Sequence, residues 1–146
     1  DTDHTIAEQA AIHIVMEQPD LSLVYFGESD LAGHESGWMS APYIAAIEDM
    51  DRALGRVTAA LQRAGIAEDF TWLFLADHGG HDRVHGSDAP EDLTIPWILS
   101  GPGAKRAHAI QSLVRIVDTA ATIAHLLDLP RPLVWEGAPV WDALDD

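Results

Sequence analysis

The clearest pattern in the chain is a stripe of hydrophobic residues spaced three and four positions apart between Ser40 and Ala64. The stripe consists of Ile47, Met50, Leu54, Val57, Leu61 and Ala64. This spacing follows the 3.6-residue turn of an α-helix, so it predicts a long amphipathic helix over residues 40–64. Ser40 suits the N-cap position, and Gly65 suits the left-handed residue that ends many helices.

Two further segments carry helical patterns. Residues 3–18 place apolar side chains on one face, and Thr5 and Glu8 have the spacing of a capping box. Residues 118–127 open with Asp118, which suits an N-cap, and stop before a proline-rich stretch. Both segments are therefore predicted to be helices.

Short and almost entirely apolar runs alternate with these helices. They predict strands at 21–26, 71–76 and 95–99, with weaker candidates within 109–117 and at 138–140. Such runs are typical of strands that are covered on both faces of a parallel sheet. The alternation predicts an α/β fold of three layers, α/β/α, with a mainly parallel sheet. Because no linker or repeat interrupts it, we expect a single domain over residues 1–146.

Composition narrows the chemistry. The 146 residues include no cysteine, so any metal site must use histidine and carboxylate ligands. The formal net charge of -16 disfavours a nucleic-acid duplex as partner. The longest apolar runs have strand length, so no membrane span is expected. The chain shows no N-terminal signal pattern, and its sequence leaves the localisation undecided.

Metal-competent side chains gather in two segments that follow predicted strands. The predicted loop at 27–37 contains Asp30 and His34, and the predicted loop at 77–92 contains Asp77, His78, His81 and His85. Loops at the carboxyl ends of parallel strands meet at one edge of a sheet. Ordinary hydrogen-bonded histidines are the alternative reading. The convergence of both loops favours a metal site.

These residues also form recognisable motifs. Residues 30–37, Asp-Leu-Ala-Gly-His-Glu-Ser-Gly, resemble the D-x-x-G-H-x-x-G signature of type I phosphodiesterases and nucleotide pyrophosphatases, a branch of the alkaline phosphatase superfamily. Residues 77–80, Asp-His-Gly-Gly, resemble the D-H-G motif that follows a strand in that superfamily. The resemblance covers nearly the whole chain. It implies the C-terminal portion of an alkaline-phosphatase-like domain, and hence an incomplete one.

The resemblance also implies a ligand set for two divalent metal ions, zinc in the first place and manganese as an alternative. Asp30, His34 and His85 would bind one ion, and Asp77 and His78 would bind the other. His81 remains open as a replacement for His85, or as a group that orients a ligand. The family completes the second site with an aspartate and a Thr or Ser nucleophile, both expected upstream of Asp1. The chain alone is therefore expected to contain no catalytic nucleophile and to be inactive.

The implied activity of the intact enzyme is metal-dependent hydrolysis of a small phosphate ester, either a phosphodiester or a pyrophosphate. A phosphosugar mutase stays open because such enzymes have similar ligands. A sulfatase is disfavoured, because the pattern of sulfatases in this superfamily has an Asp-Asn pair at the position where this chain has Asp77 and His78. The alternative to an enzyme is a non-catalytic module that binds metal or takes part in assembly. A sheet edge exposed by truncation would favour self-association.

Overall fold

The computed structural model describes residues 2–145, which fall into two compact units. The first unit combines the chain up to Ala67 with His78–Ile95. The second unit combines Glu68–Asp77 with the chain from Pro96 onward. The prediction of a single domain over residues 1–146 remains a prediction.

Helix α3, Ala41–Ala64, is the longest element of the first unit and confirms the helix predicted from the hydrophobic stripe. Ser40 is its N-cap, and its hydroxyl accepts a hydrogen bond from the Tyr43 amide at 3.4 Å. Gly65 ends the helix with φ at 76°, the left-handed conformation that glycine adopts without strain. Both predicted end residues therefore have the expected roles.

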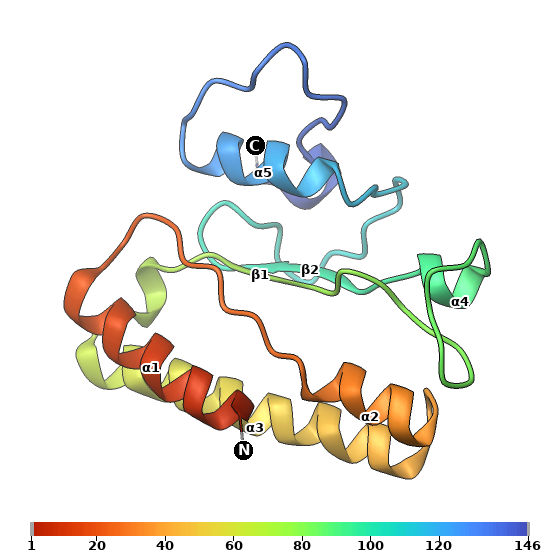
Figure 1. Ribbon diagram of the computed structural model, residues 1–146. Coiled ribbons are helices and arrows are strands. Elements are labelled where there is room, and N and C mark those ends of the chain that lie inside the picture. Colours follow the sequence, from red (N-terminus) through yellow and green to blue (C-terminus); the bar gives the residue numbers. More distant parts are fainter. Residues whose placement is uncertain (1, 146) are drawn as a thin grey trace. The chain divides into compact units, whose positions relative to one another are not determined.

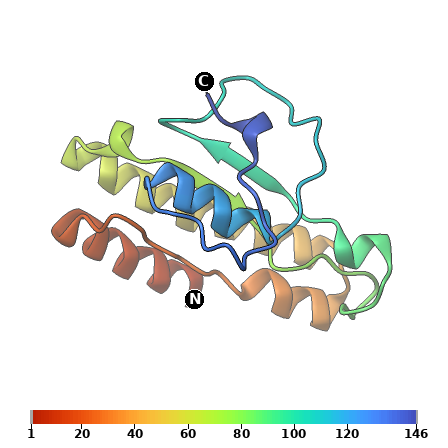
Figure 2. The ribbon, with the colours of Figure 1, turned by 90° about the horizontal axis from the view of Figure 1, so that it is seen from above.

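Two shorter helices lie along α3 (Figure 1 and Figure 2). Helix α1, Thr2–Glu17, contacts the C-terminal part of α3, and helix α2, Glu28–Ser36, contacts its N-terminal part. The buried apolar residues of α1 and α3 are Ala7, Ala11, Ile14, Ala53, Val57 and Leu61, and the alanines among them allow the two helices to approach closely. The α1 prediction is confirmed, but the helix begins before Thr5, so the expected capping box does not start it.

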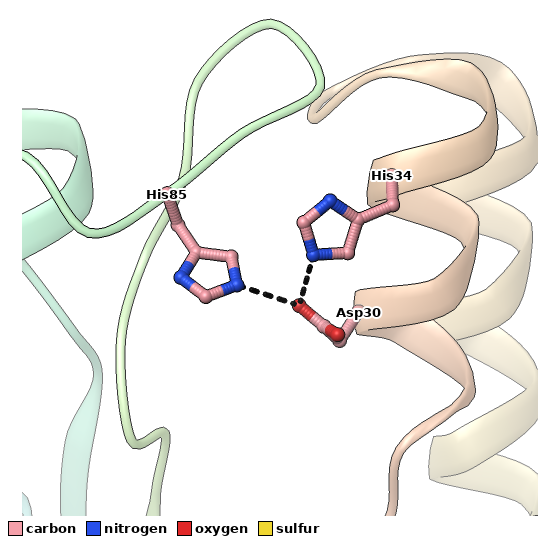
Figure 3. A group of neighbouring side chains, drawn as sticks. All are labelled: Asp30, His34 and His85. Atoms are coloured by element: carbon pink, nitrogen blue, oxygen red, sulfur yellow. Dashed lines mark ion pairs between the residues drawn. The ribbon is translucent and has the colours of Figure 1, made fainter.

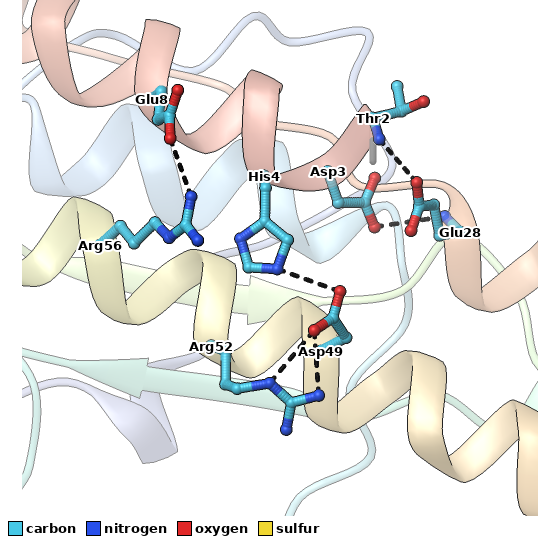
Figure 4. A network of polar contacts seen from close by, with 8 residues as sticks. All are labelled: Thr2, Asp3, His4, Glu8, Glu28, Asp49, Arg52 and Arg56. Atoms are coloured by element: carbon cyan, nitrogen blue, oxygen red, sulfur yellow. Dashed lines mark hydrogen bonds and ion pairs between the residues drawn. The ribbon is translucent and has the colours of Figure 1, made fainter.

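A polar network joins α1 to both neighbouring helices (Figure 4). The Asp3 carboxylate is 2% exposed and accepts hydrogen bonds from the backbone amides of Gly27 and Glu28, at 3.0 and 3.3 Å. His4 Nε2 lies 3.0 Å from the Asp49 carboxylate of α3. Asp3 therefore caps the start of α2, and the contact between His4 and Asp49 links α1 to α3.

The prediction of a loop over residues 27–37 is wrong, because residues 28–36 form α2. Acidic Glu28 and Asp30 lie in its first turn and His34 lies in its last turn, and both placements suit the helix dipole. Asp3 supplies acceptors for the amides at its start. This capping group is 24 residues distant from Gly27, so a local sequence pattern does not reveal it.

The second unit contains two strands, β1, Trp72–Leu75, and β2, Trp97–Ser100. Both were predicted as strands, but they pair antiparallel, with Trp72 opposite Ser100 and Leu75 opposite Trp97. The predicted mainly parallel sheet is therefore not found in the described residues. In β2, half-buried and exposed side chains alternate, as they do in a sheet with one covered face. An apolar run indicates a strand but does not determine the direction of its neighbour.

Three predicted strands do not form within residues 2–145. The segments 21–26, 109–117 and 138–140 take part in no strand pairing there, and Leu23 is 90% exposed. An apolar run becomes a strand only when a neighbouring backbone completes its hydrogen bonds. The structure assigns no strand to these segments within residues 2–145, so these three predictions are wrong for this structure.

Helix α5, Asp118–Leu126, is organised by polar contacts within the second unit. The Asp118 carboxylate accepts hydrogen bonds from the backbone amides of Arg115 and Ala138, both at the helix start. Asp118 is thus the first helical residue, and it binds flanking loops instead of acting as the predicted N-cap. The Trp97 indole donates to the Thr119 hydroxyl at 3.1 Å and so attaches β2 to α5.

Three short helices complete the structure: η1, Ala67–Asp69; α4, Pro90–Leu93; and η2, Trp141–Ala143. Across residues 2–145, none of the helices has both the length and the apolar character that a bilayer crossing requires.

Candidate metal centre

Helix α2 presents the first two candidate ligands on one face. Asp30 and His34 are separated by four residues, which is about one helical turn, so their side chains project in the same direction (Figure 3). His34 Nε2 lies 3.6 Å from Asp30 Oδ1. The same i,i+4 spacing in the sequence could have indicated a helix where a loop was expected.

The segment 78–95 brings further imidazoles to α2. A tight turn, in which His81 and Val84 pair their backbones, places two carbonyl groups against the end of the helix. The Asp82 carbonyl accepts from the Trp38 amide at 2.7 Å, and the Arg83 carbonyl accepts from His34 Nδ1 at 2.9 Å. These bonds attach the turn to α2 and place the residues that follow it beside Asp30.

Asp30 Oδ1 is the common centre of the resulting cluster. The Nε2 atoms of His34, His85 and His78 lie at 3.6, 3.7 and 3.9 Å from this single oxygen. One donor atom each from Asp30, His34 and His85 lies within 4.8 Å of the others. Figure 3 shows both imidazoles directed at the same carboxylate oxygen. The rings of His78 and His85 are stacked, with centroids 3.7 Å apart.

The spacing differs from that of ordinary histidine–carboxylate pairs in the same molecule. His4–Asp49, His81–Asp92 and His108–Asp142 are hydrogen-bonded at 3.0, 2.7 and 2.8 Å. Asp30 Oδ1, by contrast, is buried and accepts no hydrogen bond. Ligand atoms that share a tetrahedral zinc ion at about 2.0–2.1 Å lie about 3.3 Å apart. The distances around Asp30 are therefore too long for hydrogen bonds and close to those of a shared cation.

The orientation of two rings fits the same interpretation. His34 Nδ1 lies 2.9 Å from the Arg83 carbonyl, and His78 Nδ1 lies 2.8 Å from the Gly79 carbonyl. A carbonyl only accepts hydrogen bonds, so each Nδ1 carries a proton, and Nε2 is the ring nitrogen directed at Asp30. In a neutral imidazole this Nε2 is the nitrogen that can bind a metal ion.

His81, the alternative to His85 in the sequence, has another partner. Its Nδ1 is hydrogen-bonded to Asp92 of α4, whose carboxylate also accepts from the amide and hydroxyl of Ser87. The hydrogen bond to Asp92 raises the pKa of His81. Hydrogen bonds from His81 and then from Ser87 lower the pKa of Asp92 to about 2. The structure thus places His85 beside Asp30, and it places His81 in a pair that stabilises the loop.

The remaining predicted ligand, Asp77, belongs to the second unit, where it follows β1 and is exposed. Its assignment to a second metal ion, together with His78, remains a prediction. His78 itself lies in the first unit, near the same Asp30 oxygen as the other two histidines.

Two aromatic residues border the cluster, and the sequence motifs did not assign them a place in it. Tyr43 of α3 lies near enough that burial, followed by the negative charge of Asp30, raises its pKa. Trp38 makes edge contacts with the rings of His34 and His85, at centroid distances of 5.1 and 5.8 Å. Only the fold reveals that Trp38 packs against these two histidines.

Comparison with known proteins places the motifs in a family. Residues 2–93 match the model of the type I phosphodiesterase / nucleotide pyrophosphatase family. Similar curated proteins include the 2,3-bisphosphoglycerate-independent phosphoglycerate mutase of Cereibacter sphaeroides, which is 34% identical over 131 residues, covering 85% of this chain and 24% of the mutase. The mutase of the same name from Halobacterium salinarum is 29% identical over 126 residues, covering 84% and 24%.

The chain spans about a quarter of the length of the curated relatives it matches. The family match, in contrast, covers more than half of the 146 residues and includes α2 and the segment with His78 and His85. The chain therefore belongs to the type I phosphodiesterase/nucleotide pyrophosphatase family of the alkaline phosphatase superfamily.

Proposed function

We propose that this chain is the metal-ligand portion of a metal-dependent phosphoryl-transfer enzyme that hydrolyses phosphodiesters or pyrophosphates. Asp30, His34 and His85 hold one divalent ion, zinc or manganese, and Asp77 and His78 contribute to a second. The nucleophile comes from residues outside this chain. The observation that carries the proposal is the buried Asp30 oxygen, which accepts no hydrogen bond and is surrounded by imidazole nitrogens at 3.6–3.9 Å.

The donor set suits such an ion. A carboxylate and two imidazoles form a mixed N/O set typical of catalytic zinc, which keeps one position open for substrate. A divalent ion bound there supplies positive charge that polarises a phosphoryl oxygen and stabilises developing negative charge. The Arg83 carbonyl orients His34 by fixing its Nδ1 proton. Asp30 contributes the negative charge that draws a cation to the imidazoles.

Family membership supports hydrolysis, while the names of the relatives favour a second candidate. The matching curated proteins are phosphoglycerate mutases, at 34% identity for the first of them. A mutase also transfers a phosphoryl group, so the cluster around Asp30 suits either reaction. The two proposals differ in the acceptor: water in the hydrolase, and a second hydroxyl of the substrate in the mutase.

The experiment compares the 146-residue chain with the longer protein that contains it, each loaded with zinc or manganese. We expect the longer protein to hydrolyse bis-p-nitrophenyl phosphate and to lose this activity on chelation. His34→Ala and His85→Ala in the longer protein should each lower kcat/KM by at least about 100-fold, since even groups that only orient ligands contribute 10–100-fold. The chain alone should show negligible turnover.

His108→Ala is the matched control, because His108 pairs with Asp142 in the second unit and should leave turnover unchanged. Interconversion of phosphoglycerates by the longer protein, without diester hydrolysis, would replace the hydrolase with the mutase. Chelation-sensitive turnover by the 146-residue chain would show that the nucleophile lies within it. Full activity in both ligand variants would refute the assignment of the metal ligands.

A further inference from the structure

Trp38 lies between the two segments that carry the candidate ligands. It follows the C-terminal end of α2, and its indole ring contacts both α2 and the segment 78–95. We propose that Trp38 is a positioning residue, whose ring fixes the distance between His34 on α2 and His85 on the other segment. The inference rests on the proposed metal centre and adds a residue that controls its geometry.

Two glycines show how closely the ring approaches each segment. A Cβ atom added to Gly33 of α2 would lie 2.9 Å from atoms of the Trp38 ring, and one added to Gly80 would lie 2.2 Å from it. Glycine is among the poorest residues for a helix interior, so Gly33 needs a packing reason. Gly80 does not have the positive φ that would itself require glycine. At both positions the indole ring occupies the space of a side chain.

The ring also contacts one candidate ligand from each segment. Its centroid lies 5.1 Å from that of His34 with the planes at 88°, and 5.8 Å from that of His85 with the planes at 69°. These edge-to-face arrangements limit the rotation of both imidazoles. The Trp38 amide adds a hydrogen bond to the Asp82 carbonyl, next to the Arg83 carbonyl that orients His34.

Simple packing and positioning predict different results. If Trp38 only filled space, its removal would lower the stability of the fold and leave the affinity for a cation unchanged. If it positions the ligands, its removal lets α2 and the segment 78–95 separate or rotate, and the cation then loses part of its coordination. Groups that orient metal ligands without binding the metal typically contribute 10- to 100-fold in affinity.

The test is a Co²⁺ titration of the 146-residue chain, followed by calorimetry and by the visible absorption of the bound ion, which reports coordination geometry. We expect Trp38→Ala to raise the Kd for Co²⁺ by about 10- to 100-fold and to alter the spectrum. Trp38→Phe, which keeps a smaller ring, should recover part of the affinity. Val57→Ala is the matched control: it removes core volume from α3, where Val57 is 1% exposed, so it should lower Tm without changing Kd.

Gly80→Ala provides a second variant that keeps the tryptophan. The added methyl group collides with the ring, so this substitution alone should also raise the Kd. In the Trp38→Ala background the collision is absent, and Gly80→Ala should then have no further effect. This non-additivity links the two positions without requiring that any single variant be as stable as the wild type.

The outcomes separate the two proposals. A wild-type chain that binds Co²⁺ and a folded Trp38→Ala variant with the same Kd and spectrum would overturn the positioning role alone. Additive effects of Gly80→Ala and Trp38→Ala would also overturn it. A wild-type chain that binds no Co²⁺ would contradict the metal centre itself, and with it any residue said to position that centre.

Discussion

At the scale of single residues, two carboxylates with histidine neighbours differ in how their charge is compensated. Asp92 is 3% exposed and accepts three hydrogen bonds, from His81 and from the amide and hydroxyl of Ser87. Asp30 also faces imidazoles, but its Oδ1 accepts no hydrogen bond. Asp92 is thus compensated by protein groups, and we infer that Asp30 is compensated by a cation.

The His81–Asp92 pair predicts a pH dependence. The pKa of His81 is raised above 6.5. Its contribution to the stability of the fold is therefore complete below pH 6.5 and is lost as the pH rises through the raised pKa. The pKa of Asp92 is lowered from 3.8 to about 2. Its contribution to the stability of the fold is therefore complete above pH 3.8 and is lost as the pH falls towards 2. The pair therefore contributes most between pH 3.8 and 6.5.

An NMR titration of the His81 ring, with chelator present, measures this directly. We expect its pKa to lie above 6.5 in the wild type and to fall in Asp92→Asn. In urea unfolding, the stability difference between the wild type and His81→Asn should shrink from pH 6 to pH 9. A His81 pKa that does not change in Asp92→Asn would contradict the pairing.

At the scale of elements, α2 depends on α1 for its start. The amides of Gly27 and Glu28 lie at the start of α2, where a helix provides no acceptors of its own, and Asp3 of α1 supplies them. Asp30 follows only two residues after Glu28. The position of the first candidate ligand is therefore linked to a buried carboxylate on another helix.

Asp3→Ala should lower the free energy of unfolding by about 1–3 kcal/mol, because it leaves amides at the start of α2 without their acceptor. Urea unfolding of the metal-free chain measures this. Glu8→Ala is the control, since Glu8 forms an exposed ion pair with Arg56 and should cost at most about 1 kcal/mol. Equal losses in the two variants would show that the Asp3 contacts do not hold α2.

The contact between Asp3 and the start of α2 also illustrates which elements the sequence could predict and which it could not. The periodicity of residues 40–64 alone was sufficient to predict α3, because a long stripe of apolar residues has one consistent interpretation. Helix α2 is short and is capped by Asp3 of another helix, so a local pattern did not reveal it and a loop was predicted. The segment 21–26 was predicted as a strand from its apolar residues, but strand formation depends on a neighbour that a local pattern does not specify.

The candidate site was more predictable than the sheet. Asp30, His34 and His85 were grouped from motif positions, and the structure brings these three together. The expected reason was a shared edge of a parallel sheet, whereas the observed contact is between α2 and the turn at 81–84. Motif position favoured His85, but the sequence alone could not exclude His81. The choice depends on the hydrogen bond between His81 and the buried Asp92, which only the fold reveals.

At the scale of the whole molecule, the net charge of -16 favours the binding of cations, and the chain belongs to a metal-dependent superfamily. An acidic chain raises the local concentration of divalent ions and opposes the approach of phosphate groups. A bound divalent ion at Asp30 would reverse that charge locally.

The most direct test of the shared centre is the zinc content of the 146-residue chain after gel filtration, measured by elemental analysis for the wild type and for His34→Ala, His85→Ala and the control His108→Ala. We expect one zinc ion per chain in the wild type and in the control, and loss of that ion in both ligand variants. Zinc content that stays the same in His34→Ala and His85→Ala, or a wild-type chain that retains no zinc, would contradict a metal centre at Asp30.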